Sequence, residues 1–260
     1  MNIRFVIRGL LLALPIIVLG LGIWIFLQTP YSRPPDPTPP PPTILVPRGR
    51  LPTGPAGLEE WAQYENEDYV LVGSGYLLSL EGGEIVGVTA AHSVSIGNPD
   101  QPLEQIALRV PGQIDFVGEF DTLRGRPGHR LTIHDMTVDY ALLFVQQPIN
   151  PSLLLTPDAR GAPQPGERVT LYSGVRGHTQ EGTVQSSSDK VVWVLMDERF
   201  DPSLMSGSPL ISQHTGQVVG MAVAASPRLT CLYLGVHPIG SIVEKAEFAT
   251  EFPKLVELPD

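Results

Sequence analysis

The stretch Asp201-Pro202-Ser203-Leu204-Met205-Ser206-Gly207-Ser208-Pro209-Leu210-Ile211 places a short turn directly before an apolar strand. Serine, glycine and proline in succession favour a tight bend, so the hydroxyl of Ser206 is expected to stand exposed on curved backbone. A serine hydroxyl is a weak nucleophile near neutral pH and needs a neighbouring base, which a third group must orient. Ser206 is therefore a candidate nucleophile if the chain supplies those two partners.

Two upstream stretches offer such partners. His92 ends a strand-like run in Thr89-Ala90-Ala91-His92-Ser93, and Asp139 begins another in Asp139-Tyr140-Ala141-Leu142-Leu143-Phe144. Taken singly, such residues are mostly caps or surface groups. Together, in the order His, Asp, Ser, they supply a base and an orienting acid. Asp135 could compete as the acid, but Asp139 is favoured because it directly precedes an apolar strand.

These three stretches together resemble the trypsin-like (chymotrypsin-fold) serine proteases, in particular bacterial extracytoplasmic members without disulfides. The likeness extends to the glycine-rich strand 73–78 before the histidine, to residues 216–221 after the serine and to the last strand-like run, 234–239. It covers roughly residues 66 to 250. Each motif alone is weak, but several in the right order at plausible spacings make the resemblance specific.

The resemblance implies a serine endopeptidase acting on a protein or peptide. Ser206 would attack the peptide carbonyl, His92 would transfer its proton, and Asp139 would orient His92. The oxyanion hole would use the backbone N–H groups of Ser206 and Leu204. The family usually has glycine two residues before the serine, because the turn needs unusual backbone angles. Leu204, together with the absence of a recognisable basic-selective pocket, therefore favours a second hypothesis, a weak or inactive pseudoprotease that binds a peptide or partner. A structural cell-surface module is a third.

The specificity pocket departs from the basic-selective pattern. Relatives that select basic side chains carry a carboxylate six residues before the serine, where this chain has Phe200. The resemblance places the pocket walls at Phe200, Val223 and Ala224, with Ala225 and Val236 as further candidates, and predicts an apolar or small substrate side chain. Asp201 could still reach the pocket if the loop differs by one residue.

Composition excludes several function classes. The chain has 260 residues, 17% charged, and its 53 proline and glycine residues favour a turn-rich β protein. A net charge of −10 with no basic cluster makes a nucleic-acid partner unexpected. The single Cys231 allows no intrachain disulfide and is expected to be buried. No histidine pair has metal-ligand spacing, so no cofactor or metal is expected; His237 is the other histidine best placed to approach the pocket.

The N-terminus predicts a membrane anchor. Residues 9–27 form a run of 19 residues without a charge, about the length of a membrane-spanning helix. Arg4 and Arg8 precede it, which places residues 1–8 in the cytoplasm and the rest outside. A cleaved signal peptide is the competing interpretation, but the run is long and lacks an A-x-A-like site.

Residues 28–65 are predicted to form a proline-rich tether. Positions 30–55 contain 11 prolines, a composition that favours extended polyproline II. At about 3.1 Å per residue, the segment 30–42 would hold the domain about 40 Å from the membrane. A ligand for a proline-binding module is the alternative.

The remaining chain predicts an all-β fold of two antiparallel β-barrels with the reactive centre in the cleft between them. The first barrel is expected over residues 66–150, a crossover over 151–166, and the second barrel with a closing helix at 241–252 over 167–260. The expected strands of the first barrel are 69–80, 84–89, 105–110, 114–118, 131–136 and 140–146. Those of the second are 168–173, 182–186, 191–196, 208–212, 218–224 and 232–238.

Overall fold

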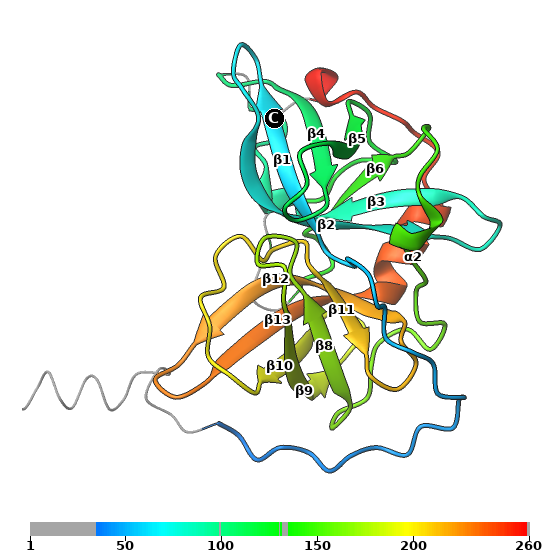
Figure 1. Ribbon diagram of the computed structural model, residues 1–260, viewed down its shortest axis with the longest axis vertical. Coiled ribbons are helices and arrows are strands. Elements are labelled where there is room, and N and C mark those ends of the chain that lie inside the picture. The colour runs from blue at the N-terminus through cyan, green and yellow to red at the C-terminus, as the bar shows by residue number, and fades with distance from the viewer. Residues whose placement is uncertain (1–34, 99, 130, 132–134, 259–260) are drawn as a thin grey trace, which may run out of the picture.

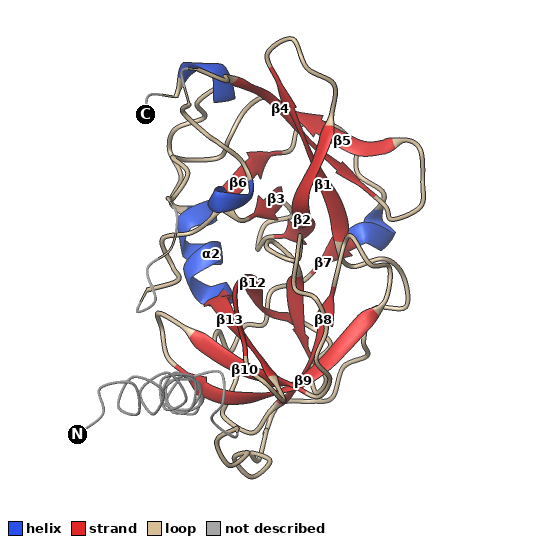
Figure 2. Ribbon diagram, turned by 90° about the vertical axis from the view of Figure 1, so that its left-hand side faces the viewer, coloured by secondary structure: helices blue, strands red, loops and turns tan. Residues whose placement is uncertain are grey.

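The computed structural model describes residues 35–98, 100–129, 131 and 135–258. Two β units lie one above the other along the long axis of the molecule (Figure 1), the first carrying β1–β6 and the second β8–β13. Helix α2 (Ile239–Glu247) follows β13 directly and lies beside the junction of the two units (Figure 2). The all-β class and the C-terminal helix are confirmed.

The first unit is a seven-stranded sheet with the order β5-β4-β1-β2-β3-β6, in which the short β7 pairs in parallel with β2. Its two ends come together because Arg124 N–H donates to the Leu142 carbonyl at 2.7 Å and Phe144 N–H donates to the Thr122 carbonyl at 3.0 Å. The sheet is therefore barrel-like. The strands are β1 (Leu58–Tyr64), β2 (Val70–Ser79), β3 (Ile85–Thr89), β4 (Leu103–Arg109), β5 (Phe116–Phe120), β6 (Ala141–Phe144) and β7 (Leu154–Leu155).

The second unit is a closed antiparallel barrel with the order β10-β13-β12-β11-β8-β9. Closure leaves no unpaired sheet edge in this half. Its strands are β8 (Arg168–Tyr172), β9 (Thr179–Ser187), β10 (Val192–Met196), β11 (Pro209–Ser212), β12 (Val218–Pro227) and β13 (Leu232–Pro238).

Three apolar clusters hold the fold together. One fills the first barrel and one fills the second. The third lies between them and combines Tyr76 and Val88 of the first unit with Met221 and Val223 of the second and Ile239 of α2. Because apolar burial is the main favourable term in folding, this shared cluster fixes how the two barrels dock.

The first strand corrects the predicted boundary at residue 66. β1 buries alternate residues, Leu58, Glu60, Ala62 and Tyr64, as a strand with one face on a core does. The sequence did not indicate it because an acidic residue, Glu60, occupies one of the buried positions. The first barrel therefore begins at residue 58.

Other boundaries also move. Half of the expected strand 131–136 falls on residues outside those described. The helix begins at Ile239 and ends at Glu247 rather than covering 241–252. After α2 the chain runs along the first barrel, where Leu123 N–H donates to the Pro253 carbonyl at 2.9 Å. The crossover contains a short 3-10 turn, Pro151–Leu153, and β7.

The proline-rich segment contacts the second barrel between residues 36 and 49, and residues 58–64 form β1, so the predicted tether does not extend to residue 65. Figure 1 shows this segment in blue, passing beneath the second barrel before it enters β1. Asp36 N–H donates to the Tyr233 hydroxyl at 3.0 Å, and the Val46 carbonyl lies 2.7 Å from His214 Nε2. Extended polyproline backbone has no internal hydrogen bonds, so its polar groups are available to the barrel.

The predicted membrane anchor, residues 9–27, lies outside the described residues and stays a prediction. Within the described part of the chain, no helix has the length and apolar character needed to cross a membrane.

Candidate active site

His92 lies between the other two predicted residues. Its Nδ1 is 2.6 Å from Asp139 Oδ2, and its Nε2 is 2.8 Å from Ser206 Oγ. His92 belongs to the 3-10 turn Ala91–Ser93, which follows β3, and Asp139 directly precedes β6. Ser206 comes from the other barrel, in the turn before β11. The structure thus brings the three side chains together at the junction of the barrels.

Asp139 is fully buried, and several donors surround its carboxylate. Besides the His92 ring, the His92 backbone N–H donates to Oδ1 at 3.1 Å, and the Leu131 N–H donates to Oδ2 at 3.2 Å. A buried carboxylate is tolerated only when such donors satisfy it. Because Asp139 accepts from Nδ1, the proton of neutral His92 is placed on Nδ1 and Nε2 is left to accept from Ser206. Asp135, the competing acid, instead accepts from Thr137.

Ser74 of β2 holds the turn that carries Ser206. Its hydroxyl donates to the Leu204 carbonyl at 3.0 Å, and its N–H donates to the Ser206 carbonyl at 2.9 Å. A side-chain carbon added at Gly207 would overlap the Ser74 carbonyl, so glycine is required where the two barrels approach. Sequence reasoning assigned no role to Ser74; its place in a Gly-Ser-Gly strand was the available signal.

Leu204 adopts the backbone conformation that glycine usually supplies. Its φ is +62°, in the left-handed region. Neither the Leu204 N–H nor the Ser206 N–H donates to an acceptor within the described residues. Both predicted oxyanion-hole amides are therefore available to an incoming oxygen, in spite of the leucine.

A small cavity of about 180 Å³ opens beside Ser206. Val223, Ala224 and Ala225, which were predicted as pocket walls, line it together with Met205 and Pro202. His92 is the one ionisable side chain among its described lining residues, whose remaining members are Ser206, Ala222 and Leu234. The cavity therefore suits a small apolar group.

Phe200 does not line this cavity, so that part of the predicted pocket is wrong. Its partly buried ring packs on the core of the second barrel, while Pro202 and Met205 occupy the wall. Val236 likewise lies within that core. Asp201 turns away from the cavity, accepts from the Ser203 hydroxyl at 2.6 Å and lies 3.3 Å from Arg176. The Ser203 hydroxyl, then its amide, lowers the pKa of Asp201.

His237 lies behind the site rather than in the cavity. It is fully buried, and its Nδ1 is 3.3 Å from the Asp139 backbone carbonyl. Burial lowers the pKa of His237 to about 4, which keeps it neutral at physiological pH. No group of three or more potential metal ligands occurs in the part of the chain that the structure describes. Cys231 is buried, as predicted.

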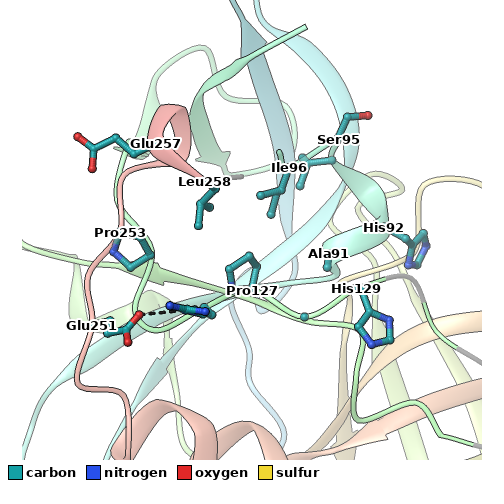
Figure 3. A pocket seen from close by; sticks show the side chains of 13 residues that line it. Ala91, His92, Ser95, Ile96, Pro127, His129, Glu251, Pro253, Glu257 and Leu258 are labelled. Atoms are coloured by element: carbon teal, nitrogen blue, oxygen red, sulfur yellow. Dashed lines mark hydrogen bonds and ion pairs between the residues drawn. The ribbon is translucent and has the colours of Figure 1, made fainter. Parts of the chain in front are cut away.

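A larger groove of about 760 Å³ adjoins His92 (Figure 3). Its walls come from the chain after His92, from residues 126–129 and from the segment after α2. Glu251 on that segment pairs with Arg126 at 3.1 Å across the groove margin. The C-terminal segment thus extends the surface beside the site, a role that sequence reasoning missed.

Comparisons with known proteins agree on the fold. No protein-family profile and no curated protein matches the sequence. Among solved structures, the chain is similar to the thermostable serine protease AL20 from an extremophilic microorganism, with a TM-score of 0.54 and 12% identity over 76% of this chain and 97% of that chain. Kallikrein-related peptidase 10 gives a TM-score of 0.53 and 15% identity, covering 76% of this chain and 95% of that chain. Neuropsin, a serine protease from mouse brain, gives a TM-score of 0.52 and 14% identity, covering 78% of this chain and 98% of that chain.

The chain therefore has the chymotrypsin fold of the trypsin-like serine proteases. At these identities the likeness shows the fold alone. The bacterial, disulfide-free subgroup stays a prediction from the sequence.

The conformation of Leu204 predicts a reversed order of stability for two substitutions. At ordinary backbone angles glycine is less stable than alanine by about 0.5–1 kcal/mol, but in the left-handed region a side chain costs about 1–2 kcal/mol. The Leu204→Gly variant should therefore be more stable than the Leu204→Ala variant, with a free energy of unfolding about 1 kcal/mol higher by denaturant titration. The matched pair at exposed Leu229, which has no positive φ, should show the ordinary order. Alanine more stable than glycine at both positions would contradict the assigned conformation.

Proposed function

We propose that the protein is a serine endopeptidase that cleaves peptide bonds through an acyl-enzyme. The observation that supports this most strongly is the pair of His92 contacts, 2.6 Å to Asp139 and 2.8 Å to Ser206, on a fold shared with serine proteases. Three residues far apart in sequence thus lie within hydrogen-bond reach, with His92 in contact with both of the others. They form a series from the orienting acid through the base to the nucleophile, as acyl transfer requires.

Acylation would begin when Ser206 Oγ attacks the carbonyl carbon of the scissile bond while its proton passes to His92 Nε2. The carbonyl oxygen becomes an oxyanion that the Leu204 and Ser206 amides stabilise; one such donor is worth about 3 kcal/mol. Collapse of the intermediate breaks the C–N bond, and His92 gives its proton to the leaving amine. Asp139 stabilises the imidazolium throughout.

Deacylation would repeat these roles with water. His92 Nε2 takes a proton from the water as its oxygen attacks the ester carbonyl, and the second intermediate expels Ser206 Oγ, which recovers the proton from His92. The products are a carboxylic acid and the regenerated hydroxyl.

The pseudoprotease alternative was based on Leu204 and on the absence of a basic-selective pocket. Leu204 adopts the positive φ that glycine usually supplies, and its amide has no acceptor among the described residues, which favours an active site. The cavity beside Ser206 can take a small apolar side chain, so the lack of a basic-selective pocket does not favour an inactive site.

Fluorophosphonate labelling tests the proposed chemistry. Wild-type protein should label at one serine, and Ser206→Ala should abolish labelling, since loss of the nucleophile costs about a millionfold in turnover. Ser188→Ala, in the exposed turn after β9 and outside the lining of the cavity beside Ser206, should label like wild type. Absence of labelling in folded wild-type protein, or equal labelling of Ser206→Ala, would overturn the proposal.

The cavity beside Ser206 predicts cleavage after small apolar residues. No carboxylate lines the described part of the cavity to hold a basic side chain, and no lysine or arginine lines it to hold an acidic one. In a peptide library, cleavage should follow residues such as alanine or valine. Ala224→Leu should reduce cleavage after valine relative to alanine by about tenfold or more, because a methylene in an apolar pocket is worth about 1–3 kcal/mol. Strict cleavage after arginine, lysine or glutamate would contradict this assignment.

A further inference from the structure

Glu60 occupies a position in β1 where the alternation of the strand calls for an apolar residue. Leu58, Ala62 and Tyr64 share its face and are buried, and Glu60 itself has no exposed surface. Its neighbour Glu59 points to the opposite face and pairs with Arg109 at 2.7 Å. A carboxyl group fully inside a barrel without a cation is costly and requires a physical explanation.

Both carboxyl oxygens of Glu60 lack a hydrogen-bond partner among the described residues, as does the buried hydroxyl of Ser93. The two groups face each other across Gly73. A side-chain carbon added at Gly73 would lie 2.6 Å from Glu60 Oε2 and 2.9 Å from Ser93 Oγ. Ser93 directly follows His92, so this buried polar pair lies under the turn that carries the proposed base.

The Thr89 hydroxyl lies close enough to Glu60 to lower the pKa of its carboxyl, as a donor to the ionised form does, although burial has the larger and opposite effect. Thr89 donates its one hydroxyl proton to the Ser74 carbonyl at 2.9 Å, which leaves the Thr89 oxygen free only to accept. A neutral Glu60 carboxyl does not compete for that proton, and neither of its oxygens has a partner among the described residues. An ionised carboxylate can only accept, so it would draw the Thr89 proton away from Ser74.

Ser74 in turn holds the Leu204 and Ser206 carbonyls at 3.0 and 2.9 Å. The chain of contacts therefore runs from Glu60 through Thr89 and Ser74 to the turn that presents the nucleophile. A side-chain carbon at Gly207 would lie 2.8 Å from Thr89 Oγ1, so Thr89 also packs directly on the residue after Ser206.

We propose, on the basis of the protease function proposed above, that Glu60 is a positioning residue that must stay neutral. While Glu60 is a neutral acid, Thr89 keeps its bond to Ser74, and Ser74 keeps the Leu204–Ser206 turn in place. Ionisation of Glu60 would break this series of contacts and lower the reactivity of Ser206.

Burial raises the pKa of Glu60 from 4.5 to about 8, so the acid is neutral at physiological pH. No nearby charge contributes to this shift. The groups that face Glu60 from the neighbouring strands and turn are uncharged: Gly73, Thr89 and Ser93. The adjacent titratable pair is His92 and Asp139, and Glu59 and Arg109 lie on the other face of the sheet.

Glutamine provides the test because its amide group stays uncharged at every pH. With the pKa of Glu60 raised to about 8, the neutral acid predominates at pH 7 and the carboxylate at pH 9.5. The rate of fluorophosphonate labelling should therefore fall by about tenfold or more over this range in wild type. Glu60→Gln should abolish this alkaline loss, and the matched variant Glu59→Gln should keep it. An identical alkaline profile in wild type and Glu60→Gln would overturn the proposal.

Unfolding measurements separate this proposal from the protease function. The unfolded chain loses the Glu60 proton near pH 4.5 and the folded chain near 8. The stability contribution of the acid is thus complete below pH 4.5 and is lost as pH rises to 8. The denaturation midpoint of wild type should fall relative to Glu60→Gln over that window and stay level above it. A difference in midpoint between wild type and Glu60→Gln that stays constant with pH would overturn the assignment of Glu60 as a neutral acid. Folded wild type that never labels, together with the pH-dependent difference, would overturn the protease function and the positioning role but not the buried neutral acid.

Discussion

The buried carboxylate of Asp139 is the constraint on which the arrangement depends. Placing a charge inside a barrel costs several kcal/mol unless donors replace water. Here His92 supplies two donors, from its backbone and its ring, and Leu131 supplies a third. These bonds fix the orientation of the imidazole, and they do so from the side opposite Ser206. The electrostatic demand of one carboxylate therefore sets the geometry of the base.

The position of Ser206, the proposed nucleophile, depends on the docking of the two barrels. Ser206 comes from the second barrel, and its turn is held through its carbonyls by Ser74 of the first. The apolar cluster shared between the barrels keeps these partners in register. Neither barrel holds the complete site, which is consistent with a reactive centre that forms only when the whole fold has formed. The Glu60 proposal extends the same logic, since its contacts lie on the first-barrel side of this junction.

The sequence alone was sufficient to predict the position of a side chain where a local motif determines it. It was insufficient where contacts between distant parts of the chain determine that position. His92, Asp139 and Ser206 each stand at the end of an apolar strand, so their motifs predicted both fold and meeting point. β1 was missed because Glu60 reads as a surface residue, although the strand buries it. The Leu204 carbonyl accepts from the Ser74 hydroxyl, 130 residues away, and no local pattern encodes that contact. Phe200 was misplaced because the path of a short loop decides which residue lines the cavity.

The tautomer of His92 is the most direct test of the central claim. Nitrogen-15 NMR of the neutral imidazole in the resting protein reports which ring nitrogen carries the proton. The account predicts a proton on Nδ1, donated to Asp139, and a bare Nε2 that accepts from Ser206. A proton on Nε2, or an even mixture of the two tautomers, would contradict it.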